Sequence, residues 1–182
     1  MELIVSVALF STIMVIITGA LLTIVDANRK SLAQQVVITN LNFALESISR
    51  VVRVGTTYHC DYTAGTITVP RDCLTGSSSF AFESNDGDSA NSNDQRVFRL
   101  NGVTGQIERS TDSGANWVPI TAPEITITRL TFFVVGADSS SETGGALQPR
   151  VIVVVTGYSN VSERSRFDFN LNTMISQRVL DL

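Results

Sequence analysis

The most prominent feature of the chain is a long apolar segment near its start. No charged residue occurs from Leu3 to Val25, and about 23 residues of helix reach roughly 34 Å, enough to cross a hydrocarbon core of about 30 Å. A secretory signal peptide is shorter, begins with basic residues and ends in a small-residue cleavage site, whereas this segment begins with Glu2. The pattern predicts a retained membrane-spanning helix. A helix in lipid tolerates all of its interruptions, which are Ser6, Ser11, Thr12, Thr18, Gly19 and Thr23.

A helical pattern continues beyond the apolar segment. Residues 26–54 contain neither proline nor glycine, and their apolar positions recur mainly at intervals of three and four, which indicates one buried stripe on a helix. Those positions are Leu32, Val36, Val37, Leu41, Ala44, Leu45, Ile48, Val51 and Val52. Gly55 is a natural helix stop. We therefore predict one helix of about 50 residues, with 1–25 as the membrane part, 26–54 as its amphipathic continuation, and no flexible linker.

After Gly55 the pattern changes to short strands and turns. Period-two alternation between turn signals predicts about seven or eight strands over residues 55–182. Residues 151–156 are an unbroken apolar run that predicts a central strand, and Asn101-Gly102 predicts a hairpin between 96–100 and 105–109. The other predicted strands are 66–69, 80–82, 117–120, 125–135 and 166–171. One long helix followed by strands predicts an α+β fold, with the helix packed on an antiparallel β-sheet head.

Composition and charge limit the classes of function. The chain has 182 residues, a formal net charge of −4 and a pI near 4.9. This length predicts one antiparallel β domain, 55–182, behind the anchor. The excess of acids argues against nucleic acid as a partner. We find no G-x-S-x-G motif, no phosphate-binding loop and only one histidine, so we expect neither enzyme activity nor a cofactor.

The two cysteines, Cys60 and Cys73, both follow the membrane segment. An even pair in an extracytoplasmic domain predicts a disulfide, which would stabilise the fold by about 3 kcal/mol. Two free buried thiols are the alternative. The spacing of these cysteines and His59 fits no zinc site, and no acid or amide completes a thiol–imidazole pair. We therefore expect His59 at the surface, and Trp117 in the core.

Two polar stretches are candidates for ligand or partner contacts. Residues 84–94 are rich in side-chain oxygen, and Asp86, Asp88 and Asp94 are candidate calcium ligands. The EF-hand pattern fails, because Ala90 replaces the third ligand and no glutamate closes the loop. The favoured interpretation is a solvated surface loop. Residues 136–148 are predicted by composition to be a connector, with contact to a partner as the alternative.

Glu2 stands at the head of the apolar segment, where a carboxylate is costly to bury without a cationic partner. In one interpretation Glu2 lies in the lipid headgroup layer. In the other it finds its partner in another copy or relative of the protein during lateral assembly. The order Glu-Leu-Ile-Val-Ser-Val-Ala-Leu-Phe-Ser from Glu2 resembles the start of mature type IV pilins and type II secretion pseudopilins. The resemblance implies that Glu2 is the fifth-position glutamate of that family, which meets the N-terminal amine of a neighbouring subunit.

The resemblance also bears on the start and the topology of the chain. Members of the family carry a basic leader that prepilin peptidase removes after a glycine, and the new N-terminus is methylated. On this match Met1 stands at the fourth mature position, so we expect the natural product to begin upstream. Arg29 and Lys30 alone would place the C-terminal end of the span in the cytoplasm. A basic leader would restore the opposite orientation, with the head outside.

The β domain resembles, more thinly, the J-class minor pseudopilins. The matching stretches are 96–100, 107–109, Trp117, 130–133, 148–150 and the closing run 169–178. This implies a structural subunit of a type IV pilus or type II secretion pseudopilus that helps to initiate or cap the filament, with 1–25 as filament-core helix. The implied partners are other pilins or pseudopilins, an inner-membrane assembly platform, prepilin peptidase and, before assembly, the bacterial cytoplasmic membrane.

A membrane-anchored adhesin or ligand-binding β domain, displayed singly, is the alternative from another class. Its binding site would lie on the long loops of the head. Substitution of Glu2 by Ala separates the two hypotheses. A filament subunit would still insert in the membrane but fail in assembly, whereas an anchored binding module would be displayed and would bind as before.

Overall fold

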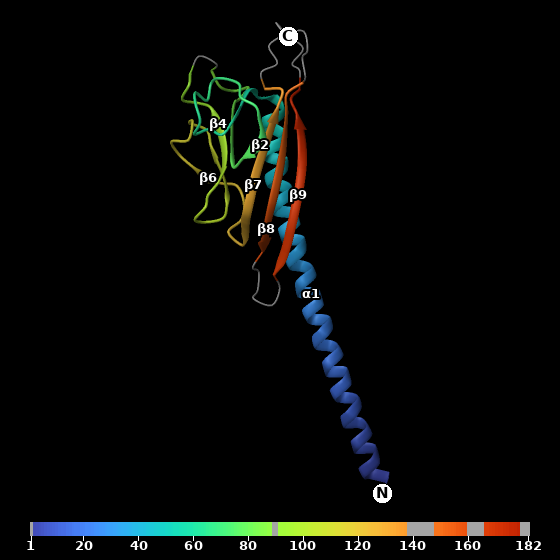
Figure 1. The fold of residues 1–182 in the computed structure, drawn as a ribbon. Coiled ribbons are helices and arrows are strands. Elements are labelled where there is room, and N and C mark those ends of the chain that lie inside the picture. Colours follow the sequence, from blue (N-terminus) through green and yellow to red (C-terminus); the bar gives the residue numbers. More distant parts are fainter. Residues whose placement is uncertain (1, 89–90, 138–147, 160–165, 179–182) are drawn as a thin grey trace. The chain divides into compact units, whose positions relative to one another are not determined.

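A computed structural model describes residues 2–88, 91–137, 148–159 and 166–178 (Figure 1). The chain divides into two compact units, Met1–Ile38 and Thr39–Leu182. The first unit is helical throughout its described residues. The second contains the end of the same helix and all nine described strands, arranged in two antiparallel sheets.

The helix, α1, spans Glu2–Val54, in agreement with the predicted helix and its predicted stop. Gly55 ends it by donating its N–H to the Val52 carbonyl at 3.0 Å. A β-carbon at Gly55 would collide with the ring of Phe82, so the residue after the helix must be glycine for the chain to enter the head. The buried hydroxyl of Tyr58 also donates to the Val52 carbonyl, at 2.6 Å. Burial raises the pKa of this phenol.

The first sheet has five strands in the order β1-β3-β4-β5-β6. They are β1 (Thr56–Cys60), β3 (Ser79–Glu83), β4 (Arg96–Leu100), β5 (Ile107–Ser110) and β6 (Val118–Pro119). The predicted hairpin at Asn101-Gly102 is confirmed, because β4 pairs with β5 from Leu100 opposite Ile107 to Val97 opposite Ser110. Only a two-residue strand forms in the predicted strand 117–120.

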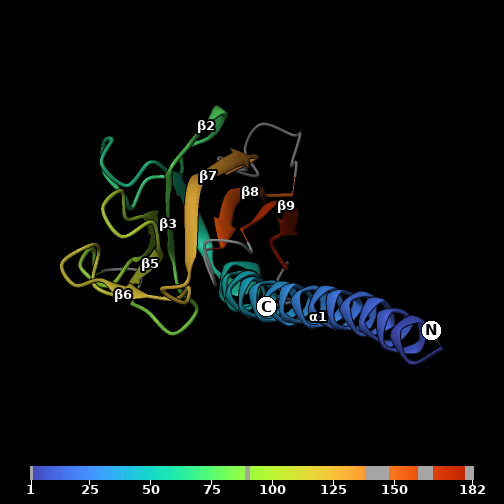
Figure 2. The same cartoon turned by 90° about the horizontal axis from the view of Figure 1, so that it is seen from below.

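The second sheet has four strands in the order β2-β7-β8-β9. They are β2 (Cys73–Ser77), β7 (Ile125–Val135), β8 (Arg150–Ser159) and β9 (Phe167–Ser176). The predicted central strand is confirmed, since β8 lies between β7 and β9 (Figure 2). Every second residue of β7 and β8 is buried over most of their length. After β9, Arg178 donates its N–H to the Arg53 carbonyl at 2.7 Å, which ties the last strand to the end of α1.

Aromatic rings join the two sheets. Phe80 of β3 stacks on Phe132 of β7 with ring centroids 5.6 Å apart, and both side chains are fully buried. The rings of Tyr58, Phe82 and Phe98 extend the cluster along the first sheet. From the helix, the buried residues in the second unit are Leu41, Ala44, Ile48 and Val52. Their spacing of three and four is the predicted buried stripe, and the α+β class with a helix on a sheet is confirmed.

The head also departs from the prediction in its sheets and at residues 66–69. The strands form two sheets, not one. Residues 66–69, predicted as a strand, form a turn in which Val69 donates its N–H to the Thr66 carbonyl at 3.0 Å. Their alternating pattern is overridden because Pro70 follows at once and the segment lies between the two cysteines, where the short connection leaves it no neighbouring strand.

Candidate functional site

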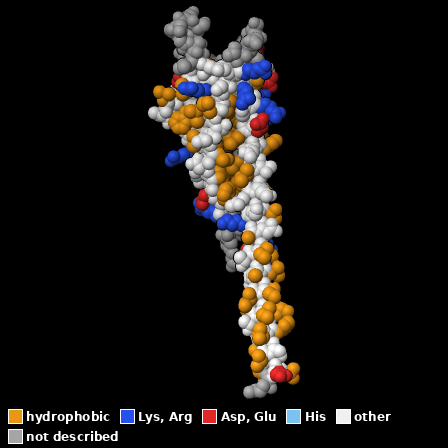
Figure 3. Space-filling model, turned by 90° about the vertical axis from the view of Figure 1, so that its right-hand side faces the viewer, with side chains coloured by type: hydrophobic (Ala, Val, Ile, Leu, Met, Phe, Trp, Pro, Cys, Tyr) orange, Lys and Arg blue, Asp and Glu red, His pale blue; other side chains and the backbone are white. Residues whose placement is uncertain are grey.

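The apolar part of α1 is the first candidate surface. Large hydrophobic side chains are exposed along residues 2–25, for example Leu3 at 82% and Val15 at 73% of their possible area. Figure 3 shows hydrophobic side chains along the face of the helix turned to the viewer. By length and composition this is the one helix among the described residues that could cross a membrane. A surface of this size is not stable in water and requires lipid or protein around it.

Hydroxyl groups in this segment do not make it polar. Each donates to the main-chain carbonyl four residues earlier, at 2.8–3.0 Å. The residues concerned are Ser6, Ser11, Thr12, Thr18 and Thr23. Because these donors are satisfied within the helix, the segment can be surrounded by apolar groups without an unpaired hydroxyl proton.

Glu2 is the first residue of α1 and its side chain is exposed. A carboxylate at this end is favoured by the helix dipole, but that partial charge does not neutralise it. Among the described residues none forms an ion pair with Glu2. The next cation in the sequence is Arg29, roughly 40 Å further along the helix. Met1, and with it the predicted upstream start, lies outside the described residues.

The candidate calcium ligands do not converge as a set of three. The Asp86 carboxylate accepts two hydrogen bonds from the Arg96 guanidinium, at 2.9 and 2.6 Å, and another from the Ser84 hydroxyl. These bonds, first of all the one from Ser84, lower the pKa of Asp86. The Asp94 carboxylate instead accepts a hydrogen bond from the main-chain N–H of Asp88 at 2.8 Å. Ala90 lies outside the described residues.

No metal centre of the common kind is formed in the described part of the chain. There, no group of three or more His, Cys, Asp and Glu side chains is arranged to hold a metal ion.

Of the loop 136–148, residues 138–147 lie outside the described residues. Gly136 and Ala137 donate their N–H groups to the Asp72 carboxylate at 3.1 and 2.7 Å.

The predicted disulfide between Cys60 and Cys73 is confirmed, with the two Cα atoms 5.9 Å apart. The expectation of a surface histidine is wrong, since His59 is only 2% exposed. Its Nδ1 lies 2.6 Å from the Val69 carbonyl and its Nε2 lies 2.8 Å from the Ala64 carbonyl. The ring thus anchors the segment enclosed by the disulfide. Sequence reasoning missed this role because both acceptors are main-chain atoms of an irregular loop, which have no residue signature.

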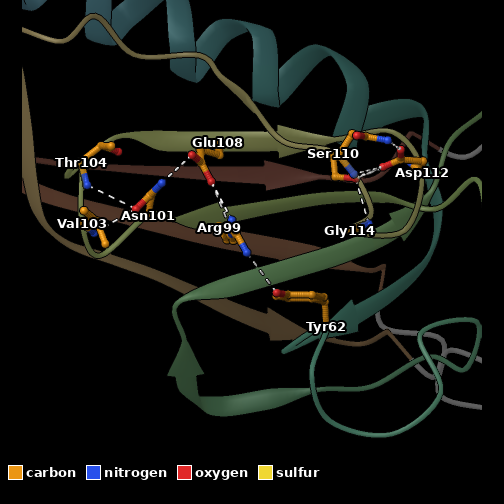
Figure 4. A network of polar contacts seen from close by, with 10 residues as sticks. Tyr62, Arg99, Asn101, Val103, Thr104, Glu108, Ser110, Asp112 and Gly114 are labelled. Atoms are coloured by element: carbon orange, nitrogen blue, oxygen red, sulfur yellow. Dashed lines mark hydrogen bonds and ion pairs between the residues drawn. The ribbon is translucent and has the colours of Figure 1, made fainter.

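A polar network on the β4–β5 hairpin was not predicted (Figure 4). Arg99 binds Glu108 through two hydrogen bonds of 3.0 Å, and Glu108 also accepts the Asn101 amide at 2.6 Å. Arg99 further donates to the Tyr62 hydroxyl at 3.3 Å. Arg99 and Glu108 are cross-strand partners, whereas the ends of the predicted strands, Leu100 and Gly105, would have placed Arg99 opposite Gln106. The charges cancel within the pair, so this network stabilises the hairpin and offers no free charge to a ligand.

Trp117 belongs to this network, not to the core as predicted. The Arg99 guanidinium carbon lies 3.6 Å from the centre of the indole ring, and Tyr62 meets the ring edge-on at 5.5 Å. Trp117 remains half-exposed. A tryptophan can be held at the surface in this way because a cation on its face and an aromatic edge replace apolar packing.

The turn after β5 supports a prediction about acid titration. Asp112 accepts hydrogen bonds from the Ser110 hydroxyl and from the main-chain and side-chain nitrogens of Asn116, at 2.6, 2.8 and 2.5 Å. These bonds, with Ser110 the largest cause, lower the pKa of Asp112 to about 2. The ordinary value is about 3.9, so this contribution to stability is complete above about pH 4 and is lost as pH falls through about 2.

We expect Ser110→Ala to raise the pKa of Asp112 and to shift this loss of stability to higher pH. Carbon-13 NMR of the Asp112 carboxyl group during an acid titration measures the change directly. Ser113→Ala is the matched control, because the Ser113 hydroxyl donates to the Ser92 carbonyl and not to Asp112. An unchanged titration of Asp112 in Ser110→Ala would contradict the assigned cause.

The candidate surfaces therefore differ in kind. The polar groups of the hairpin network and of the disulfide region form hydrogen bonds within the head, so these two regions stabilise the fold. The apolar segment that begins with Glu2 is exposed, and by length and composition it could cross a membrane. Comparison with known proteins adds no assignment, because the chain matches no protein-family model, no curated protein and no solved structure.

Proposed function

We propose that the protein is a structural subunit of a pilus-like filament of the type IV pilus or type II secretion class. In the filament the apolar segment 2–25 would pack among the same segments of neighbouring subunits, and Glu2 would pair with the N-terminal amine of a neighbour. The observation that carries the proposal is the combination at the start of α1: an acid that forms no ion pair with any described residue heads an exposed apolar helix whose hydroxyl groups donate to its own main-chain carbonyls.

The continuity of α1 also supports this proposal. The helix is unbroken from Glu2 to Val54, and its last part contributes Leu41, Ile48 and Val52 to the core of the head. An anchor that only tethers a domain needs no such continuity and commonly has a flexible linker. A filament subunit gains from it, because the helix packed in the filament core is then the same element that fixes the head.

The finer assignment is to a minor pilin or pseudopilin that helps to initiate or cap the filament. Its partners would be other pilins or pseudopilins, the inner-membrane assembly platform and prepilin peptidase. Before assembly the subunit would reside in the bacterial cytoplasmic membrane with its head outside. We propose no enzymatic activity.

Substitution of Glu2 tests the proposal. In the native host, we expect Glu2→Ala to insert in the membrane like the wild type. Its amount in the filaments sheared from the cells should be lower by at least about a hundredfold, because the buried N-terminal amine of the neighbouring subunit would lose its partner, which costs about 3–5 kcal/mol. Glu46→Ala is the matched control. Glu46 is an exposed acid of the same helix, and its ion pair with Arg50 is long, at 3.9 Å, and lies at the surface.

Two results would overturn the proposal. One is incorporation of Glu2→Ala at the wild-type level, and the other is absence of the wild-type protein from every filament fraction. Either result would favour a single-pass anchored binding module. Mass spectrometry of the native N-terminal peptide adds an independent measurement, because prepilin peptidase leaves an N-methylated residue.

A further inference from the structure

A polar cleft lies on the head where three segments of the chain meet. Residues 61–63 after β1, residues 77–79 between β2 and β3, and residues 99–102 at the start of the hairpin turn line it. Its volume is about 500 Å³, within the range of about 300–1,000 Å³ that is usual for small-molecule sites. The charged residues of the lining are Asp61 and Arg99. The cleft is therefore large enough for a small ligand, and its lining calls for a polar one.

The main chain at Asp61 is fixed in an uncommon conformation. Its φ is 65°, in the left-handed region that few residues other than glycine adopt. Asp61 directly follows Cys60 of the disulfide, and its N–H donates to the Ser79 carbonyl at 3.1 Å. The next N–H, of Tyr62, donates to the Ser79 hydroxyl oxygen at 3.3 Å. Residues in such conformations persist where their surroundings hold them, and they cluster at functional sites.

The two oxygens of the Asp61 carboxylate differ in their contacts. Oδ1 accepts the Thr63 N–H at 3.2 Å and the Thr63 hydroxyl at 2.7 Å, and the Ser79 hydroxyl lies 3.5 Å from it. Oδ2 accepts no hydrogen bond from the described residues. The bond from the Thr63 hydroxyl is the first cause that lowers the pKa of Asp61, so the group is a carboxylate at neutral pH. One oxygen thus holds the turn, and the other is left as an acceptor.

Tyr62 and Arg99 supply donors in the same cleft. The Tyr62 hydroxyl accepts a hydrogen bond from Arg99 Nη1 at 3.3 Å (Figure 4), so its own proton remains to be donated. The Arg99 charge is neutralised by Glu108 through two hydrogen bonds of 3.0 Å. The cleft therefore combines an acceptor that carries a negative charge with a phenol donor and a paired cation. A hydroxyl group suits both positions, because it can donate to the carboxylate and accept from the phenol.

We propose that this cleft binds a neutral saccharide, with sugar hydroxyl groups on Asp61 and Tyr62. A phosphate or carboxylate ligand would be repelled by Asp61 and would find the Arg99 charge already paired. A sugar ring also has apolar C–H faces, which pack on aromatic rings. The half-exposed rings of Tyr62 and Trp117, which meet edge-on at 5.5 Å, offer such a surface. For a single hexose, a dissociation constant of about 1–10 mM is expected from the number of its atoms.

The test uses the full chain in micelles of a detergent that has no sugar headgroup. Amide NMR spectra are recorded while glucose, galactose, mannose or N-acetylglucosamine is added, each up to about 50 mM, several times the expected dissociation constant. We expect at least one of the four sugars to cause saturable shifts, centred on residues 61–63, 77–79 and 99–102. Glycerol and inorganic phosphate at the same concentration are the control solutes, and neither should reproduce these shifts.

Two conservative substitutions separate the groups of the cleft. Asp61→Asn can keep the acceptor for Thr63 and the left-handed conformation, but it removes the charge, and it should weaken binding by at least about tenfold. Tyr62→Phe keeps the ring and removes the hydroxyl, and it should weaken binding about 3–10-fold. Asp168→Asn and Tyr158→Phe are the matched controls and should bind like the wild type. Both residues contact Arg166 on the other sheet, outside the cleft.

Absence of saturable shifts with all four sugars would overturn the inference. So would an equal response to glycerol or phosphate, or wild-type affinity in Asp61→Asn. The titration of the wild type decides the question even where a variant fails to fold. The inference goes beyond the proposed function, and none of these measurements depends on filament assembly, so either one can fail without the other.

Discussion

Replacing Phe132 by Ala is expected to lower the free energy of unfolding by about 3–5 kcal/mol, the usual range for a buried phenylalanine. The Phe132 side chain is fully buried and stacks on Phe80, which belongs to the other sheet. The substitution therefore removes apolar area, leaves a cavity and breaks the ring contact between the sheets. Little of the cavity can close, because both flanking strands are fixed by their hydrogen-bond ladders.

Urea unfolding of the full chain in micelles measures this change, with the fluorescence of Trp117, the single tryptophan, as the signal. Phe133→Ala is the matched control. Phe133 is the next residue of β7, of the same type, but it is half-exposed on the opposite face. We expect the control to lose much less stability. Equal losses in the two variants would contradict the assignment of Phe132 as the ring that joins the sheets.

Much of the architecture could be predicted because its signals are local. The end of α1 follows from Gly55 and from the stripe Leu41, Ala44, Ile48 and Val52, and the β4–β5 hairpin follows from Asn101-Gly102. The strand β8 was recognisable as central from its apolar run. The division into two sheets was not predictable, because strand pairing joins residues far apart in the chain and one sequence carries no register for them.

The polar contacts of the head were less predictable than its strands, because they join residues far apart in the chain or involve main-chain atoms. His59 is buried by carbonyls of the disulfide loop, and Trp117 is held by Arg99 and Tyr62. The contact between Glu83 and Gln95 was not foreseen, since only folding places the end of β3 beside the residue that precedes β4. Glu2 is the opposite case, because its significance comes from the apolar run that follows it and needs no tertiary contact.

Removal of the disulfide is expected to cost about 3 kcal/mol, from the entropy of closing a loop with a sequence separation of 13. Its position gives it a further role. Cys60 ends β1 at the edge of the five-stranded sheet, and Cys73 begins β2 at the edge of the four-stranded sheet. The bond therefore joins the two sheets covalently. The double substitution Cys60→Ala and Cys73→Ala tests it by urea unfolding, and reduced wild type is the control. Variant stability within about 1 kcal/mol of the oxidised wild type would contradict the prediction.

The two losses are expected to be coupled. Cys60 is the cross-strand partner of Phe80, and the Cys73 sulfur lies 3.4 Å from the Phe132 carbonyl. The covalent link and the ring contact thus hold the same junction between the sheets. Once one is removed, the sheets separate more easily and the other has less to hold, so the combined variant should differ from additivity by about 0.5–3 kcal/mol. Strict additivity would mean that the junction does not act as a unit, and that each link stabilises only its own sheet.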